Sequence, residues 1–130
     1  LEGMDLEDID LSDTNLKRAN LSRTNLTEAI FNRAEMQGCN LKDANCASAT
    51  FAGSNISEAD FSGANLIRAN FKDVIAHKTI FIRIKSFKGA VLWNADCTEA
   101  DFRGSNLEEV GEIDRAGLIT EGAKIGGANV

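Results

Sequence analysis

Apolar residues recur at every fifth position from Leu1 to Phe71 without exception. The residue two positions before each of them is usually small and often alanine, and the residue directly before is usually Asn or Asp. A period of five fits neither a strand, whose side chains alternate with a period of two, nor a helix, whose period is 3.6. The repeating unit is therefore a small residue, Asn or Asp, a large apolar residue and two free positions.

Each unit predicts a short extended segment followed by a turn. The small and the large apolar residue are two positions apart, so they share one side of the extended segment. Asn and Asp favour the turn, because they tolerate turn geometry and bond to nearby backbone. A chain of such units must coil with its apolar residues inward, and we predict a solenoid in which each coil is buried against the next.

The repeating units resemble those of the pentapeptide-repeat proteins, whose pattern is A(D/N)LXX. The resemblance rests on units such as Ala19-Asn20-Leu21, Ala44-Asn45-Cys46, Ala59-Asp60-Phe61 and Ala64-Asn65-Leu66. It implies an all-β fold, the right-handed quadrilateral β-helix with four units in each coil. For this chain we expect about six coils that become irregular toward the C-terminus.

Coils of twenty residues make a specific prediction about the phenylalanines. Phe31, Phe51 and Phe71 should lie above one another on one wall of the core. Phe61 and Phe81 should form a second stack on the opposite wall. A narrow core lined by two aromatic stacks on facing walls is favourable for ring packing.

We expect a single domain over residues 1–130, divided into three stretches. Regular coils should occupy 1–75, coils with a bulge 76–107, and irregular terminal coils or a cap 108–130. The bulge is predicted near Lys85-Ser86, because the apolar pattern returns one residue late at Phe87.

The stretch after Leu107 allows two interpretations. In the first, Ile113 and Leu118 are inward residues of irregular coils, and the units Ala123-Lys124-Ile125 and Ala128-Asn129-Val130 restore the pattern. In the second, a short helix covers Leu107–Leu118. Gly111 and Gly117 would each destabilise that helix by about 1 kcal/mol, so we favour the irregular coils.

The charge of −6 is unevenly distributed along the chain. Acidic residues crowd the first thirteen positions, and a basic cluster interrupts the middle of the chain at Lys78, Arg83, Lys85 and Lys88. No apolar run approaches the roughly 20 residues of a membrane-spanning helix, so we expect no membrane insertion.

Candidate chemistry is scarce. The lone His77 lies in an irregular turn without an activated nucleophile, and the regular carboxylates stand in outward positions. Cys39, Cys46 and Cys97 occupy inward positions and should be buried thiols rather than a disulfide or a metal site. We therefore expect no catalytic residues, cofactor or metal, and a protein that is not an enzyme.

A group of apolar residues in outward positions is the candidate partner surface. Ile75, Ile80 and Val91 replace the usual Asn or Asp, while Ile82 and Trp93 follow an inward residue. Exposed apolar side chains, and tryptophan in particular, often mark contact sites. The alternative is that the segment Glu108–Gly122 covers these residues, which lie on different walls of the coil.

The favoured function is a non-enzymatic scaffold or interaction module that presents a rigid surface to a protein partner. The alternative, implied by the family resemblance, is an acidic DNA mimic that inhibits an enzyme such as DNA gyrase. We expect no direct nucleic-acid binding, and weak end-to-end self-association through the last coil. The pattern is in register from Leu1, so we expect a longer native chain. The compartment stays open between the cytoplasm and, for a cyanobacterial or chloroplast protein, the thylakoid lumen.

Overall fold

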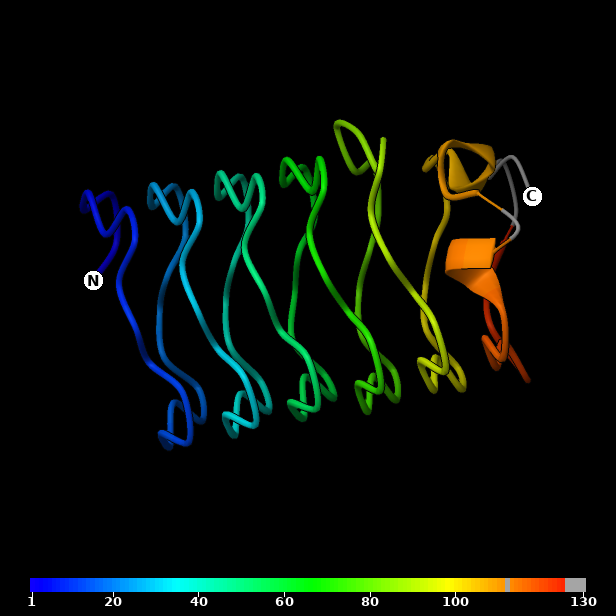
Figure 1. Ribbon diagram of the computed structural model, residues 1–130, viewed down its shortest axis with the longest axis horizontal. Helices are drawn as coiled ribbons and strands as arrows, with labels where there is room; N and C mark the ends of the chain where they lie inside the picture. Colours follow the sequence, from blue (N-terminus) through cyan, green and yellow to red (C-terminus); the bar gives the residue numbers. More distant parts are fainter. Residues whose placement is uncertain (112, 126–130) are drawn as a thin grey trace.

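The chain coils into a rod whose turns stack along its long axis (Figure 1). The computed structural model describes residues 1–111 and 113–125, which form a right-handed quadrilateral β-helix. Parallel β-bridges join residues 20 apart, from Asp5–Asn25 to Asp60–Ile80. The predicted four-unit coil is therefore confirmed over this part of the rod.

Each unit ends in a tight turn, and the geometry of this turn explains why Asn or Asp precedes the large apolar residue. The carbonyl of the large apolar residue accepts the N–H three residues later, as in Leu26–Ala29 at 3.0 Å. The second turn residue has a positive φ, as in a type II turn; Glu58 has a φ of 60°. The Asn or Asp oxygen then accepts the N–H of the first turn residue, as Asn55 does from Ser57 at 3.0 Å.

The core has four walls, which we number by their large inward residues, and each outward residue is assigned to the wall of its own unit. Wall 1 holds Leu21, Leu41, Phe61, Phe81 and Phe102, and wall 2 holds Leu26, Cys46, Leu66 and Phe87. Wall 3 holds Phe31, Phe51, Phe71 and Leu92, and wall 4 holds Met36, Ile56, Ala76 and Cys97. All of these inward residues are buried.

The two predicted phenylalanine stacks are confirmed. On wall 3, the ring of Phe51 is 5.0 Å from that of Phe31 and 4.8 Å from that of Phe71, centroid to centroid. On wall 1, Phe61 and Phe81 stack at 5.3 Å. The stacks meet edge to face across the core, with Phe51 and Phe61 5.5 Å apart at 82°. The two stacks thus form one aromatic column inside the core.

One extra residue enters the coil just before Ser86. The bridge spacing changes from 20 residues at Asp60–Ile80 to 21 at Asn65–Ser86. At this bulge the hydroxyl of Ser105, from the next coil, accepts the Ile84 N–H at 3.0 Å and donates to the Phe81 carbonyl. In a regular unit these two backbone groups bond directly to each other. The buried hydroxyl therefore closes the turn that the extra residue opens.

Replacing Ser105 with alanine should lower the free energy of unfolding by about 1–3 kcal/mol, because the variant leaves the Ile84 N–H and the Phe81 carbonyl buried without partners. Ser54 is a matched control in the same kind of inward position. Its hydroxyl donates to the Phe51 carbonyl, which also accepts the Ser54 N–H at 3.0 Å, so Ser54→Ala orphans no group. A urea titration in which both variants lose equal stability would contradict this role.

Beyond the bulge, two short 3₁₀-helices interrupt the coil: η1 (Leu107–Glu109) and η2 (Ile113–Arg115). The bridge spacing here widens to 23 residues, at Asp96–Ile119 and Asp101–Lys124. The Glu109 carboxylate accepts the Phe87 N–H at 2.6 Å. A side chain thus replaces the backbone acceptor that the next coil supplies elsewhere.

The prediction that Ile113 points inward is wrong, since 85% of its surface is exposed. The turn after η1 brings Val110 into the core instead, through a bond from its N–H to the Leu107 carbonyl. The alternative of one helix over Leu107–Leu118 is also wrong, because the described residues form only the two short 3₁₀-helices. Leu118 packs against the core and is partly buried. The predicted unit Ala128-Asn129-Val130 lies outside the described residues.

The three cysteines are buried and unpaired, as predicted. Burial raises the pKa of Cys46 and of Cys97 to about 12, and that of Cys39 to about 11. Among the residues that the structure describes, no helix has the length and apolar character needed to cross a membrane.

Candidate partner-binding surface

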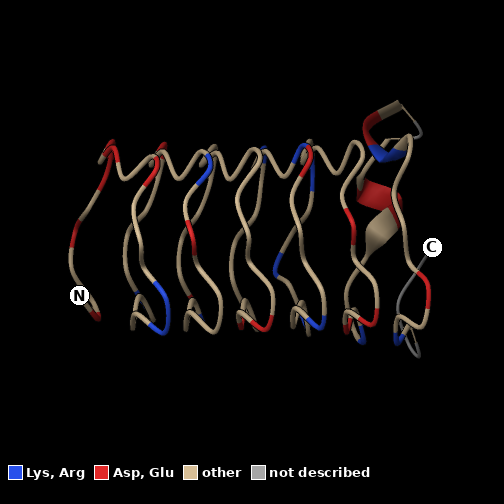
Figure 2. Cartoon of the chain, turned by 90° about the horizontal axis from the view of Figure 1, so that it is seen from below, with Lys and Arg blue, Asp and Glu red and all other residues tan. Residues whose placement is uncertain are grey.

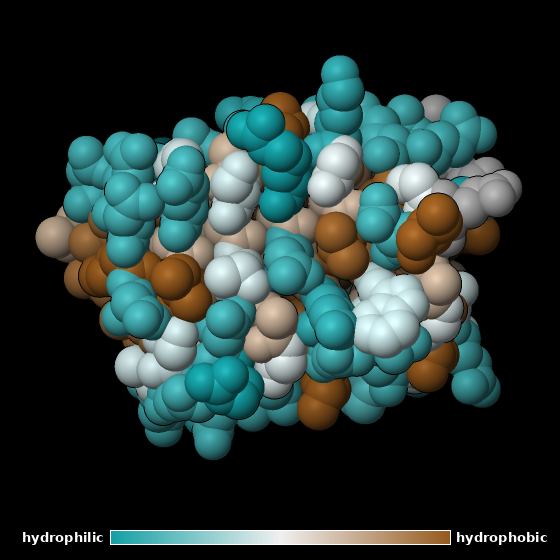
Figure 3. All heavy atoms as spheres, viewed as in Figure 1, coloured by the Kyte–Doolittle hydropathy of each residue, from teal (hydrophilic) through white to brown (hydrophobic). Residues whose placement is uncertain are grey.

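The five predicted surface residues lie within one turn of the rod, residues 74–95. This stretch contains no Asp or Glu, and we call it the acid-free turn. Ile75 and Trp93 are exposed over 44% and 38% of their surface, and the other three are half-buried. The residues occupy three walls: Ile75 wall 4, Ile80 and Ile82 wall 1, and Val91 and Trp93 wall 3. Apolar residues likewise form separate patches on the face shown in Figure 3.

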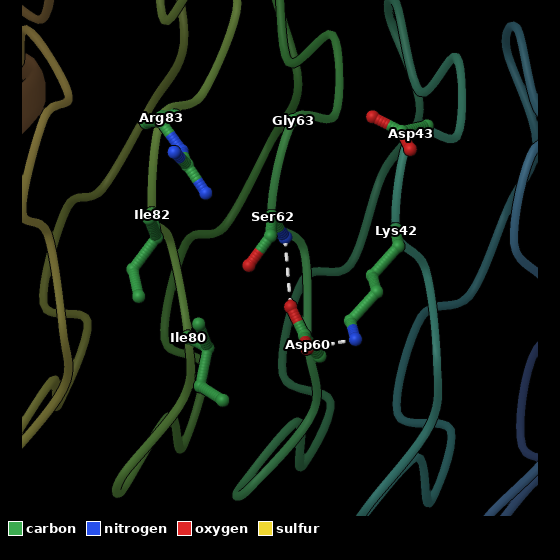
Figure 4. A pocket seen from close by; sticks show the side chains of 8 residues that line it. All are labelled: Lys42, Asp43, Asp60, Ser62, Gly63, Ile80, Ile82 and Arg83. Atoms are coloured by element: carbon green, nitrogen blue, oxygen red, sulfur yellow. Dashed lines mark hydrogen bonds and ion pairs between the residues drawn. The ribbon is translucent and has the colours of Figure 1, made fainter.

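Wall 1 is hollowed on both sides of Ile80 and Ile82. The first hollow, of about 510 Å³, is drawn in Figure 4 and is lined by Lys42, Asp43, Asp60, Ser62, Gly63, Ile80, Ile82 and Arg83. It forms where the small residues Ser62 and Gly63 lie between two coils with longer side chains. Ile80 also borders a second hollow of about 490 Å³ on its C-terminal side. The two isoleucines therefore form an apolar ridge between hollows.

Ion pairs surround this apolar ridge. Lys42 and Asp60 are 3.4 Å apart, and Lys78 and Glu99 are 3.7 Å apart. Arg103 holds Asp101 at 2.6 Å, and this hydrogen bond lowers the pKa of the Asp101 carboxyl. An apolar centre with a charged, solvated rim is the usual anatomy of a protein–protein contact.

Trp93 is only partly covered. The ammonium of Lys72, one coil earlier on wall 3, lies 4.7 Å from the centre of its ring. On the other side, the N–H of Asn94 bonds to the Ala116 carbonyl, so the segment after η2 continues the coil beside Trp93. This segment extends the rod, and the ring keeps an exposed edge.

His77 is held by a carboxylate rather than by a nucleophile. Its Nε2 is 2.7 Å from Asp96 Oδ2, and the Thr98 hydroxyl donates to the same carboxylate at 2.6 Å. These hydrogen bonds, first that of Thr98 and then that of His77, lower the pKa of Asp96. The Thr98 hydroxyl donates its proton to Asp96, so His77 does not activate it as a nucleophile. His77, Asp96 and Thr98 together stabilise a surface turn. Within 1–111 and 113–125, no three His, Cys, Asp or Glu side chains are grouped as metal ligands would be.

The acid-free turn lacks side-chain acceptors that most other units supply, and the unit pattern alone did not show this loss. With isoleucine or valine at 75, 80 and 91, the turn N–H groups of His77, Ile82 and Trp93 have no side-chain acceptor in the described structure. The absence of Asn or Asp at these three positions of the sequence could have predicted that the turn hydrogen bonds are missing. Two further outward isoleucines, Ile30 and Ile67, were also missed; both are half-buried and lie on coils nearer the N-terminus.

These features define a β-solenoid built from five-residue units, with one coil that departs from the rule on its outer surface. The chain belongs to the pentapeptide repeat family: pentapeptide repeats, in eight copies, match residues 5–43, 44–81 and 86–110. A search among curated protein sequences finds no match.

Among the solved structures similar to this chain are two pentapeptide repeat proteins. One is a pentapeptide repeat protein from the thylakoid lumen of Arabidopsis thaliana, with 28% identity, a TM-score of 0.72, and coverage of 76% of this chain and 68% of that one. The other is HetL from the cyanobacterium Nostoc, a pentapeptide repeat protein involved in the regulation of heterocyst differentiation. It has 17% identity, a TM-score of 0.55, and coverage of 98% and 87%. The second likeness shows the fold alone.

Proposed function

We propose that the protein is a non-enzymatic interaction module that binds a protein partner through wall 1 of the acid-free turn. The observation that carries this proposal is the apolar ridge of Ile80 and Ile82, set between two hollows and bordered by ion pairs. Ile75 extends the apolar surface onto the neighbouring wall 4. Val91 and Trp93 lie on the opposite wall 3, so only a partner that wraps around the rod would reach them.

The local cost of this surface supports the proposal. Each missing Asn or Asp removes a hydrogen bond worth roughly 0.5–1.5 kcal/mol to a turn. Ile80 is half-buried and accepts no hydrogen bond from the Ile82 N–H, so its unit loses this bond. Departures from local rules are expected at functional sites, and this coil departs from the repeat rule three times, at positions 75, 80 and 91.

The test is a double variant, Ile80→Ser with Ile82→Ser, matched by Ile30→Ser on wall 3. Proteins captured from the native source by the wild type should be purified and titrated against all three forms. We expect the double variant to bind at least about tenfold more weakly, because apolar anchors at the centre of a contact contribute at least about 1.4 kcal/mol. The control should bind like the wild type. Equal binding by all three forms contradicts the proposed surface.

The alternative of a DNA mimic needs a continuous negative surface. Acidic residues dominate the N-terminal coil, but both signs of charge occur on the later coils (Figure 2). Several carboxylates are also paired with bases, among them Asp13 with Arg33 at 2.8 Å. We therefore expect no inhibition in a DNA gyrase supercoiling assay at micromolar protein. Inhibition would reverse the order of the two functions.

A further inference from the structure

Arg83 lies in the turn that ends the wall 1 unit of the acid-free turn. Its neighbours at the same place in the two adjacent coils are glycines, Gly63 and Gly104. The Gly63 N–H bonds to the Ile82 carbonyl at 3.0 Å, and the Arg83 N–H bonds to the Arg103 carbonyl at 3.1 Å. These bonds place Gly63, Arg83 and Gly104 in one line along the rod. A Cβ added to Gly104 would lie 3.0 Å from Arg83 Cγ, so the glycine leaves room for the arginine stem.

Two other arginines at this turn position, Arg33 and Arg68, reach back one coil for a partner. Arg33 donates from two nitrogens to Asp13, at 2.8 and 2.9 Å. Arg68 donates to the Ser48 hydroxyl at 3.2 Å. The residue in the corresponding place for Arg83 is Gly63, which offers no side chain. Among the described residues, the Arg83 guanidinium therefore has no hydrogen-bond acceptor and no ion pair.

The carboxylates around Arg83 do not neutralise it. Asp60 is held by Lys42 and Asp101 by Arg103. The Asp43 carboxylate, from the coil before Gly63, leans over that glycine and occupies the place where a side chain there would begin. It lines the first hollow together with Arg83, and no ion pair joins the two among the described residues (Figure 4). The acid-free turn itself contributes only cations. The positive charge of Arg83 thus remains available to a ligand.

A third hollow, of about 340 Å³, lies on the other side of Arg83 and is lined by Ile82, Arg83, Arg103 and Gly104. A planar guanidinium beside a hollow is suited to a carboxylate, which it binds through two parallel hydrogen bonds. The neighbouring isoleucine supplies apolar surface for the aliphatic part of the same ligand.

We infer that Arg83 binds a carboxylate side chain of the partner, and that Ile80 and Ile82 receive aliphatic residues next to it. The occupant is an apolar, acidic segment of a partner protein. This inference rests on the proposed function and adds the chemistry of the segment that wall 1 selects.

The test uses two synthetic peptides with the native protein in NMR titrations. One is acetyl-Leu-Glu-Ile-Asp-Val-amide, and the other has Gln and Asn in place of its two acids. We expect the acidic peptide to shift the amide signals of Gly63, Ile82 and Gly104, and to bind about tenfold or more tightly than the amide peptide. Arg83→Gln should remove this preference. Lys88→Gln, which removes an equal charge on wall 2, should keep it.

Several outcomes would overturn the inference. If both peptides bind equally, Arg83 does not recognise the carboxylate, and only the apolar contact with Ile80 and Ile82 is supported. If neither peptide moves wall 1 signals, the segment chemistry is wrong, while the capture experiment judges the proposed surface separately. If sodium acetate or inorganic phosphate alone produces the same shifts at equal concentration, Arg83 binds small anions only. If the wild type self-associates and Arg83→Gln abolishes this, the occupant is a second copy of the chain.

Discussion

Replacing Phe51 by alanine should lower the free energy of unfolding by about 3–5 kcal/mol. The ring is fully buried, stacked between Phe31 and Phe71, and in edge contact with Phe61. Truncation removes all three aromatic contacts and leaves a cavity in a core that is narrow. Relaxation around it is restricted, because each neighbouring ring is fixed by its own coil.

The measurement is a urea titration followed by circular dichroism. Ser57→Ala is the control, because Ser57 lies in a free turn position and its hydroxyl makes no hydrogen bond in the described structure. The control should change the stability by no more than about 0.5 kcal/mol. If both variants lose the same stability, the assignment of inward and outward positions is wrong.

Raising the pH from 8 to 10 should destabilise the protein through its buried thiols. The pKa of Cys46 and of Cys97 is raised from 9.0 to about 12 in the fold by loss of solvation. Below pH 9 both the folded and unfolded states keep the proton, so stability is unaffected. Above pH 9 the unfolded thiol ionises first, and stability falls until the folded pKa is reached. At pH 10 the loss is about 1.4 kcal/mol for each of these two thiols, or roughly 3 kcal/mol together, and Cys39, whose pKa is raised to about 11, adds a similar amount.

The double variant Cys46→Val with Cys97→Val isolates this effect, because lysines titrate alike in both proteins. Denaturant midpoints measured at pH 8 and pH 10 should fall more steeply for the wild type than for the variant. Parallel loss of stability in the two proteins would show that the thiols are not responsible. A thiol reagent at pH 8 offers an independent check, since all three cysteines should react only as the chain unfolds.

Most of the rod could be predicted from the sequence, because the structure of each coil depends on a short residue pattern that repeats. The position of Leu26 or Phe51 in its unit decides which way the side chain points. The polar residue before it, Asn25 or Thr50, accepts the N–H of the first turn residue. The twenty-residue coil then places Phe31, Phe51 and Phe71 in register without further information.

The region after Leu107 could not be predicted, because its structure rests on contacts that have no period. The 3₁₀ turn of η1 moves the inward position to Val110 and leaves Ile113 in solvent. The Glu109 carboxylate then replaces a backbone carbonyl for Phe87, and no five-residue pattern encodes that exchange.

The candidate surface was only partly visible in the sequence. Outward isoleucines follow from the unit pattern, and Ile80 and Ile82 were found in this way. The isolation of Arg83 depends on residues one coil away on each side, Gly63 and Gly104. Aligning the chain in steps of twenty residues, with one added at the bulge, would have exposed both glycines.

The bridge spacing before the bulge is a constant twenty residues, so positions on this part of the rod are separated by whole coils. Each coil adds roughly 4.8 Å along the axis. Inserting or excising one whole coil before Phe61 would preserve every register, yet move the acid-free turn by one coil relative to the acidic end. The separation between two sites on such a protein can therefore change only in steps, while each site itself is left intact.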